Sequence, residues 1–178
     1  MISSKGTYNI WIGGSCDYGH KERAGAAAAV IELDGMVIDR KQIADLHTTE
    51  FRMMLALMAQ LMDDLPEGSD ITFLTNAAYI QNFDREPGPK SANPDLIRQC
   101  LESKKRHTSV SVKIVPYHKS PLLIETHDVS TEAMKQIRSR QFRASFHTFE
   151  YRGGLQIDKV FVLEGLRHIF SALFPMDS

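Results

Sequence analysis

The sequence predicts a mixed α/β fold in which helices pack on a central sheet. Three strand-like segments follow one another within residues 8–43, and the hairpin sequence Asp34-Gly35 joins the last two. An amphipathic helix pattern occupies residues 51–62, and strand and helix patterns alternate after it up to residue 137. A hairpin series of strands followed by this alternation is typical of a layered α/β domain.

The first of these segments predict three strands. Tyr8–Ile12 alternates between apolar and polar residues, and Gly13-Gly14-Ser15 then predicts a sharp turn, because glycine accepts backbone angles that other residues resist. Ala24–Leu33 is apolar and is expected to be the second strand, although its alanines also suit a helix. Met36–Ile43 is then the antiparallel third strand.

The clearest helix follows these strands. Its apolar residues obey the i, i+3, i+4, i+7 spacing of one helix face and are Phe51, Met54, Leu55, Met58, Leu61 and Met62. The hydroxyl of Thr48 or Thr49 can cap the first free N–H groups. Pro66-Glu67-Gly68 is expected to end the helix.

The second half alternates between strands and helices. The predicted elements are a strand at Ile71–Thr75, a short helix at Ala77–Phe83, a surface loop at Asp84–Pro94, a helix at Asp95–Lys105, a strand at Ser109–Val115 and a helix at Thr131–Ile137. Pro121-Leu122-Leu123-Ile124 makes the loop before the last helix unusually apolar.

The pattern changes after Phe142. Phe146–Tyr151 and Leu155–Val162 predict a hairpin, and an apolar helical stripe ended by Pro175 follows it. We therefore expect a main domain at 1–140 and a C-terminal hairpin and helix extension at 141–178. Residues 146–174 of this extension either pack on the main domain or form a homodimer or a docking site for another protein.

Composition describes an ordinary soluble protein. The 178 residues include 21 Lys and Arg against 22 Asp and Glu, so no global field draws the chain onto nucleic acid or a membrane, and such binding would need local patches. Cys16 and Cys100 do not have zinc-site spacing and are expected to be reduced packing residues, which fits a cytoplasmic protein. No apolar run approaches the ~20 residues of a membrane span, so no membrane partner is expected.

Four segments resemble, in order and spacing, the four catalytic segments of type 1 ribonuclease H. They are YNIWIGGSC at 8–16, TTEFRMMLALMAQL at 48–61, FLTNAAYI at 73–80 and VPYHKS…HD at 115–128. His118 precedes Asp128 by ten positions, the spacing that the family uses between its flexible catalytic histidine and its last metal-binding aspartate. The resemblance covers residues 8–134 and implies a ribonuclease H-like mixed five-stranded sheet flanked by helices.

The same resemblance argues against the family's reaction. Each catalytic segment of the family supplies one carboxylate, and the matching positions here are Gly13, Arg52, Asn76 and Asp128. Two-metal hydrolysis needs anionic oxygens that hold Mg²⁺ or Mn²⁺ ~4 Å apart. With Asp128 as the only retained ligand, we expect no catalytic residue, no metal and no cofactor, and Mg or Mn only if the site is active after all.

Neighbouring residues do not replace the lost ligands in this interpretation. Glu50 stands two helical positions before Arg52, which is about 200° around the helix and therefore on another face. His127 lies beside Asp128 but has no third or fourth ligand near it in the sequence.

Two main functions remain open. The first is a catalytically inactive ribonuclease H-like domain that binds an RNA–DNA hybrid or duplex backbone without cutting it. Arg52 either grips a phosphate with its guanidinium or forms a neutralising ion pair with Asp128. The expected nucleic-acid contacts are Ser15, Cys16, Thr48, Thr49, Arg52, Arg138, Arg140 and Arg143. The second function is a protein-interaction or oligomerisation module that uses the fold as a scaffold. A weak metal-dependent ribonuclease is the third alternative.

Overall fold

A computed structural model describes the backbone of residues 5–150 and the side chains of residues 5–139, apart from those of Asn82 and Asp84. Residues up to Ala144 form one compact unit and Ser145 begins a second, and the whole sheet lies in the first. None of the helices within residues 5–150 combines the length and apolar character needed to cross a membrane.

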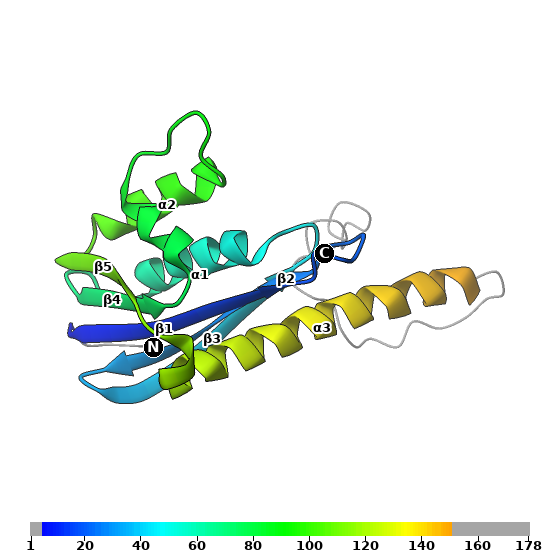
Figure 1. Ribbon diagram of the computed structural model, residues 1–178, viewed down its shortest axis with the longest axis horizontal. Helices are drawn as coiled ribbons and strands as arrows, with labels where there is room; N and C mark the ends of the chain where they lie inside the picture. Colours follow the sequence, from blue (N-terminus) through cyan, green and yellow to red (C-terminus); the bar gives the residue numbers. More distant parts are fainter. Residues whose placement is uncertain (1–4, 151–178) are drawn as a thin grey trace, which may run out of the picture. The chain divides into compact units, whose positions relative to one another are not determined.

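The sheet is mixed, as predicted. Its strands are β1 (Thr7–Cys16), β2 (Gly25–Leu33), β3 (Met36–Asp45), β4 (Asp70–Thr75) and β5 (Ser109–Ile114). They lie in the order β3-β2-β1-β4-β5, with β2 antiparallel to both β1 and β3, and with β1, β4 and β5 parallel (Figure 1). The β2–β3 hairpin turns at Asp34 and Gly35, whose φ angles of 51° and 83° are both left-handed.

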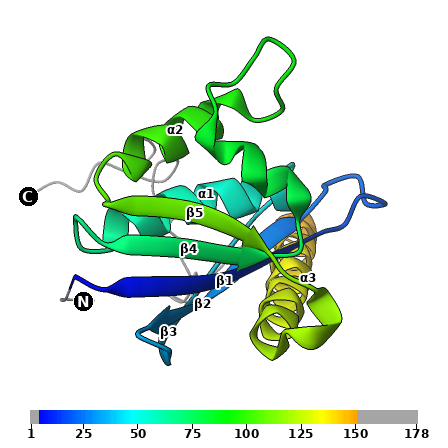
Figure 2. The same cartoon turned by 60° about the vertical axis from the view of Figure 1, so that its left-hand side comes forward.

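Helices cover both faces of this sheet. They are α1 (Glu50–Asp64), α2 (Pro94–Lys104) and α3 (Pro121–Glu150), with short 3₁₀ helices η1 (Ala78–Asp84) and η2 (Tyr117–Lys119). Figures 1 and 2 show α1 and α2 on one face of the sheet and α3 on the other. The β1 strand is therefore enclosed from two sides.

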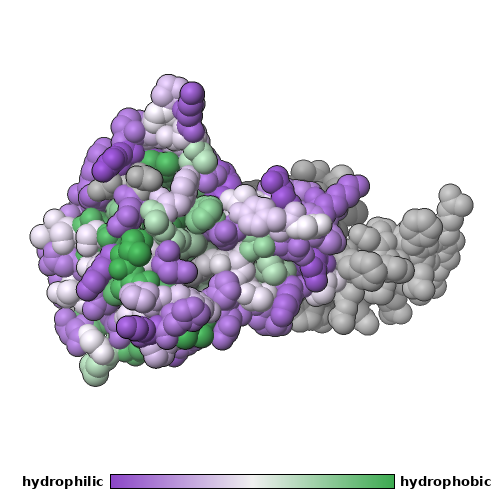
Figure 3. Space-filling view, in the orientation of Figure 1, coloured by the Kyte–Doolittle hydropathy of each residue, from purple (hydrophilic) through white to green (hydrophobic). Residues whose placement is uncertain are grey.

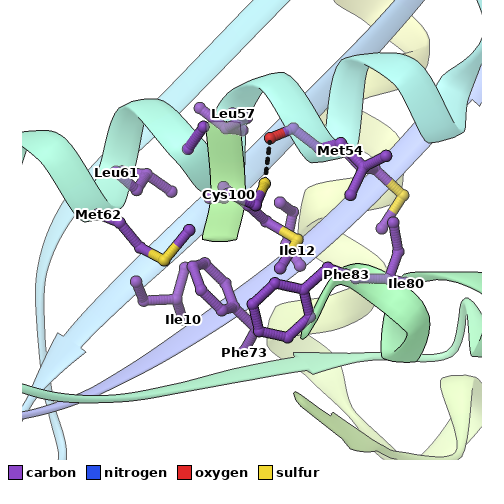
Figure 4. Close-up of a cluster of buried hydrophobic side chains, with 14 of the residues drawn as sticks. Ile10, Ile12, Met54, Leu57, Leu61, Met62, Phe73, Ile80, Phe83 and Cys100 are labelled. Atoms are coloured by element: carbon purple, nitrogen blue, oxygen red, sulfur yellow. Dashed lines mark hydrogen bonds between the residues drawn. The ribbon is translucent and has the colours of Figure 1, made fainter. Parts of the chain in front are cut away.

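The main core lies between the sheet and α1. Figure 4 shows Ile10, Ile12 and Phe73 of the sheet facing the α1 side chains of Leu57 and Met62. Such apolar side chains contribute about 1.5–3 kcal/mol each when fully buried. The α2 helix closes this core through Cys100, whose thiol donates to the Leu55 carbonyl at 3.4 Å.

The predicted turn at Gly13-Gly14-Ser15 is wrong, because all three residues belong to β1. Their small size serves close packing on both faces. A Cβ at Gly14 would meet the Met54 side chain of α1 at 3.0 Å, and a Cβ at Gly13 would meet Thr126 Oγ1 of α3 at 2.6 Å. Glycine in a strand here marks a close approach of two helices.

The last helix is much longer than the pattern at 131–137 predicted. It starts at Pro121, so the apolar Pro121–Ile124 segment is its first turn and not a loop. The helix also continues through residues 146–150, where the first hairpin strand was expected. The predicted boundary between residues 140 and 141 falls inside α3 and stays a prediction. The remaining hairpin and helix, residues 151–178, lie outside the described residues.

Candidate functional site

A cavity of about 270 Å³ lies where the fold brings β1, α1, β4 and α3 together. Its lining residues come from β1, α1, α3 and the start of the connection after β4: Gly13, Gly14, Glu50, Phe51, Met54, Asn76, Ala77, Leu123 and His127. Because β1 and β4 are parallel neighbours, their carboxyl ends meet at one edge of the sheet, where α/β folds commonly bind ligands.

Gly13 and Asn76 occupy the cavity as the sequence predicted. Gly13 contributes no side chain, and α3 uses the space that a side chain would need, since Thr126 Oγ1 lies 2.6 Å from an ideal Cβ built there. Asn76 follows the last residue of β4 and is neutral. These two positions supply no anionic oxygen.

The α1 helix presents Glu50 to the cavity, and here the sequence interpretation is wrong. Glu50 is the first residue of α1 and lies four positions before Met54. Both side chains pack on Gly14, with Glu50 Cβ and Met54 Cγ each 3.0 Å from an ideal Cβ. The core spacing of Met54 was the signal that could have placed Glu50 on this face. Its Oε2 is buried and accepts no hydrogen bond from a described residue.

Arg52 points away from the cavity, toward α2. Its guanidinium donates to both carboxylate oxygens of Asp95, at 3.0 and 2.6 Å, and to Asn93 Oδ1 at 3.4 Å. The predicted ion pair with Asp128 is therefore not formed. The reason is the 200° separation of positions 50 and 52, because α1 turns Glu50 toward the cavity and Arg52 toward its neighbour helix.

The α3 helix lines the cavity with His127 and Leu123, which lie four residues apart on one face. Asp128 is exposed and is not among the lining residues. His118 lies in η2 and is exposed. Tyr117 links the two histidines, with its ring edge-on to His118 at 5.3 Å and to His127 at 5.7 Å.

Glu50 changes the chemistry of two neighbours. Burial of the hydroxyl and the Glu50 carboxylate raise the pKa of Tyr18 to about 12. Burial, and then the Glu50 carboxylate, raise the pKa of the Cys16 thiol, while Arg23 opposes both shifts. Tyr18 and Cys16 are therefore neutral at physiological pH.

Most residues expected to contact nucleic acid bind within the domain. The Ser15 hydroxyl shares hydrogen bonds with Ser130 at 2.9 Å and Thr131 at 2.7 Å, and the Cys16 thiol donates to the Thr48 carbonyl at 3.5 Å. The Thr49 hydroxyl accepts from the Arg52 backbone N–H at 3.2 Å and caps α1.

The structure describes two of the four other expected contacts, Thr48 and Arg138. Thr48 is 6% exposed. Arg138 forms an ion pair with Asp17. The side chains of Arg140 and Arg143 lie outside the described residues.

The side chains of this cavity do not fit a pair of Mg²⁺ or Mn²⁺ ions. Such ions need several anionic oxygens, and the lining residues supply one carboxylate, that of Glu50. Among the described residues, no group of three or more His, Cys, Asp or Glu side chains is arranged to hold a metal ion.

Solved structures of ribonucleases H share this fold. LC9-RNase H1, a type 1 RNase H with the type 2 active-site motif, matches at a TM-score of 0.63 and 15% identity, over 75% of this chain and 74% of the other. The N-terminal RNase H domain of Rv2228c from Mycobacterium tuberculosis matches at 0.62 and 11%, over 75% and 99%. RNase H1 from the halophilic archaeon Halobacterium salinarum matches at 0.55 and 12%, over 72% and 99%.

Comparisons with protein-family models and with curated protein sequences find no match. The structural similarity extends over the β1–β5 sheet order and the helices on both of its faces. The chain therefore has the ribonuclease H-like fold, at 11–15% sequence identity to these three structures.

Proposed function

We propose that this chain is a ribonuclease H-like domain that does not hydrolyse nucleic acid by the two-metal mechanism. The observation that carries this proposal is the lining of the cavity, where Glu50 is the one carboxylate beside Gly13, Asn76 and His127. A single carboxylate cannot hold two divalent ions at the spacing that the mechanism needs. Thr126 also occupies the space that an acidic side chain at position 13 would use.

The retained function in this proposal is binding of a nucleic-acid backbone without cleavage. The fold is that of domains described as RNases H, and Arg23 and Lys119 are exposed. The charge of Arg23 acts on Cys16 and Tyr18, and Lys119 lies in η2, whose Tyr117 ring contacts His127 of the cavity. Neither Arg23 nor Lys119 forms an ion pair with a described side chain, whereas Arg52 forms an ion pair with Asp95. Arg23 and Lys119 are therefore our preferred phosphate contacts.

Fluorescence anisotropy of a labelled RNA–DNA hybrid in low salt tests the binding. We expect a saturable rise for the wild type and a weaker affinity, by threefold or more, for the double variant Arg23→Ala/Lys119→Ala. The matched control is Arg98→Ala/Lys105→Ala, which removes the same two charges from the middle of α2 and from its C-cap.

The two double variants separate the outcomes. An equal loss in both would mean that only net charge matters, and the proposed contacts would be wrong. A flat wild-type trace would contradict nucleic-acid binding for hybrids altogether.

A second function, self-association, is favoured by the start of β3. Met36, Val37 and Ile38 are 70%, 39% and 41% exposed on a strand at the edge of the sheet. An exposed apolar edge strand offers free backbone groups and apolar side chains to another strand. Under this alternative the wild type sediments as a dimer and Val37→Lys as a monomer. A wild type that stays monomeric at high concentration would contradict it.

A further inference from the structure

A second and larger cavity lies between α1, η1, α2 and the loop that joins η1 to α2. Its volume is about 420 Å³, within the range of small-molecule sites. Nothing in the proposed nucleic-acid function uses it. Figure 3 shows a hydrophobic spot directly below the loop at the top of the molecule, surrounded by hydrophilic residues.

The floor of this cavity is apolar and fixed. Leu55, Phe83 and Ile97 line it and are only 1%, 2% and 5% exposed, so they belong to the core and cannot move far. Tyr79 forms one wall, where its ring lies 4.8 Å from that of Phe51. An aromatic or aliphatic group placed here would exchange water for apolar surface.

The loop above the floor is held in place by hydrogen bonds. The Tyr79 hydroxyl donates to the Ala92 carbonyl at 2.8 Å, and Asn93 Nδ2 donates to the same hydroxyl at 3.5 Å. The Tyr79 wall and the end of the loop at Ala92 and Asn93 are therefore in place before any ligand enters, which lowers the entropic cost of binding.

The rim of the cavity carries positive charge. Arg85 and Lys90 line it, are exposed and form no ion pair with a described side chain. The one carboxylate among the lining residues, Glu86, is compensated by Arg98 at 3.2 Å. A guanidinium and an ammonium group without partners, above an apolar floor, match a ligand that has an apolar body and an anionic head.

We propose that this cavity binds a small organic acid, with a ring-sized apolar group on the floor and a carboxylate between Arg85 and Lys90. The apolar body supplies burial, and the carboxylate supplies orientation. The structure favours a free small molecule because the volume of the cavity, about 420 Å³, is that of a small-molecule site.

The probe for the test is sodium 2-naphthoate, with 2-naphthalenemethanol as its neutral counterpart of the same ring. Both are titrated into the ¹⁵N-labelled full chain and followed by ¹H–¹⁵N correlation spectra. We expect saturable shifts of the amides at residues 85–92 with naphthoate, and an affinity for the alcohol at least tenfold weaker.

Two double variants then distinguish the effect of the two rim cations from the effect of net charge. Arg85→Glu/Lys90→Glu should weaken naphthoate binding at least tenfold. The control Lys113→Glu/Lys135→Glu makes the same change of net charge at exposed positions of β5 and α3 and should leave the affinity unchanged. The same spectra report whether each variant is folded. If the glutamate variant is unfolded, Arg85→Gln/Lys90→Gln replaces it.

Three results would overturn the proposal. The first is an equal affinity for naphthoate and the neutral alcohol, and the second is an equal loss in both double variants. The third is a set of shifts located away from this cavity, including the absence of any shift in residues 85–92.

Discussion

Gly13 determines how closely α3 approaches β1, because the space beside its α-carbon is filled by Thr126. The cavity that remains has one carboxylate, on Glu50, and neutral or basic side chains elsewhere. The charge of the cavity lining follows from the orientation of two α1 residues, because Glu50 faces the cavity and Arg52 faces Asp95.

An acidic residue introduced at position 13 should destabilise the protein and should not make the cavity a nuclease site. Gly13→Asp forces a Cβ to 2.6 Å from Thr126 Oγ1, and overpacking of this kind costs about 1–3 kcal/mol. Urea unfolding measures this loss of free energy. Gly88→Asp is the control, because a Cβ at Gly88 meets nothing within 4 Å. Equal stability of Gly13→Asp and wild type would show that α3 does not pack on β1 in this way.

The two thiols should differ sharply in reactivity. Cys100 is fully buried, and burial raises its pKa to about 12, whereas Cys16 is half-buried. Since the thiolate is the reactive form, Cys100 should react with a disulfide reagent at mildly alkaline pH only after unfolding. Mass spectrometry of the labelled peptides identifies the site. Rapid labelling of Cys100 in the native protein would contradict its place between α2 and α1.

The Arg52–Asp95 pair should contribute a small, pH-dependent stability. Arg52 holds the pKa of the Asp95 carboxyl below its usual range. The contribution is therefore present above the ordinary carboxyl pKa and is lost as pH falls through the lowered value. Because both side chains are well exposed, Arg52→Ala should cost about 0.2–1 kcal/mol at neutral pH. Urea unfolding at neutral and acid pH checks this, and a difference that persists in acid would be contrary to the pairing.

At the scale of elements, the first turn of α1 determines which of its side chains faces the cavity. The Thr49 side chain caps the helix, so Glu50 becomes the first helical residue and faces the end of β1. A helix start shifted by two residues would present Arg52 to the cavity instead. The cap is thus a structural determinant of which side chain the cavity receives.

Removing the cap should therefore weaken α1. Thr49→Ala loses the hydrogen bond to the Arg52 N–H and should cost about 1 kcal/mol in urea unfolding. Thr49→Ser keeps the hydroxyl and should retain most of the stability. If serine and alanine destabilise the protein equally, the hydroxyl does not act as the cap.

Element patterns in the sequence were sufficient for the order of the strands and for α1, η1 and α2, and insufficient for the end of β1 and the start of α3. The Asp34-Gly35 hairpin and the apolar face of α1 follow from local chemistry, and both are confirmed. The glycines of β1 were misassigned to a turn because they serve contacts distant in the sequence, Gly13 with Thr126 of α3 and Gly14 with Met54 of α1. The start of α3 at Pro121 was missed because its apolar first turn is not amphipathic.

The candidate site was predictable in its location and not in its composition. Gly13 and Asn76 line the cavity as the resemblance implied. Glu50 and His127 line the cavity, and Arg52 and Asp128 do not, because the rotation of each helix decides which of two close positions faces inward. Sequence spacing alone does not fix that rotation.

At the scale of the whole molecule, the chain has the ribonuclease H-like sheet order, and Gly13 and Asn76 supply no carboxylate at the edge where β1 and β4 end. Its net charge of −1 gives no general attraction to nucleic acid, so binding depends on local basic side chains such as Arg23. Fold and chemistry are separate properties here, as in other widely used folds.

The most direct test of the central claim is hydrolysis of an end-labelled RNA–DNA hybrid in Mn²⁺, followed on a gel for wild type and Glu50→Gln. Glu50→Gln removes the one carboxylate that lines the cavity. We predict no cleavage above the protein-free control for either protein. Mn²⁺-dependent cleavage by the wild type that Glu50→Gln abolishes would contradict the claim and show that the cavity is an active nuclease site.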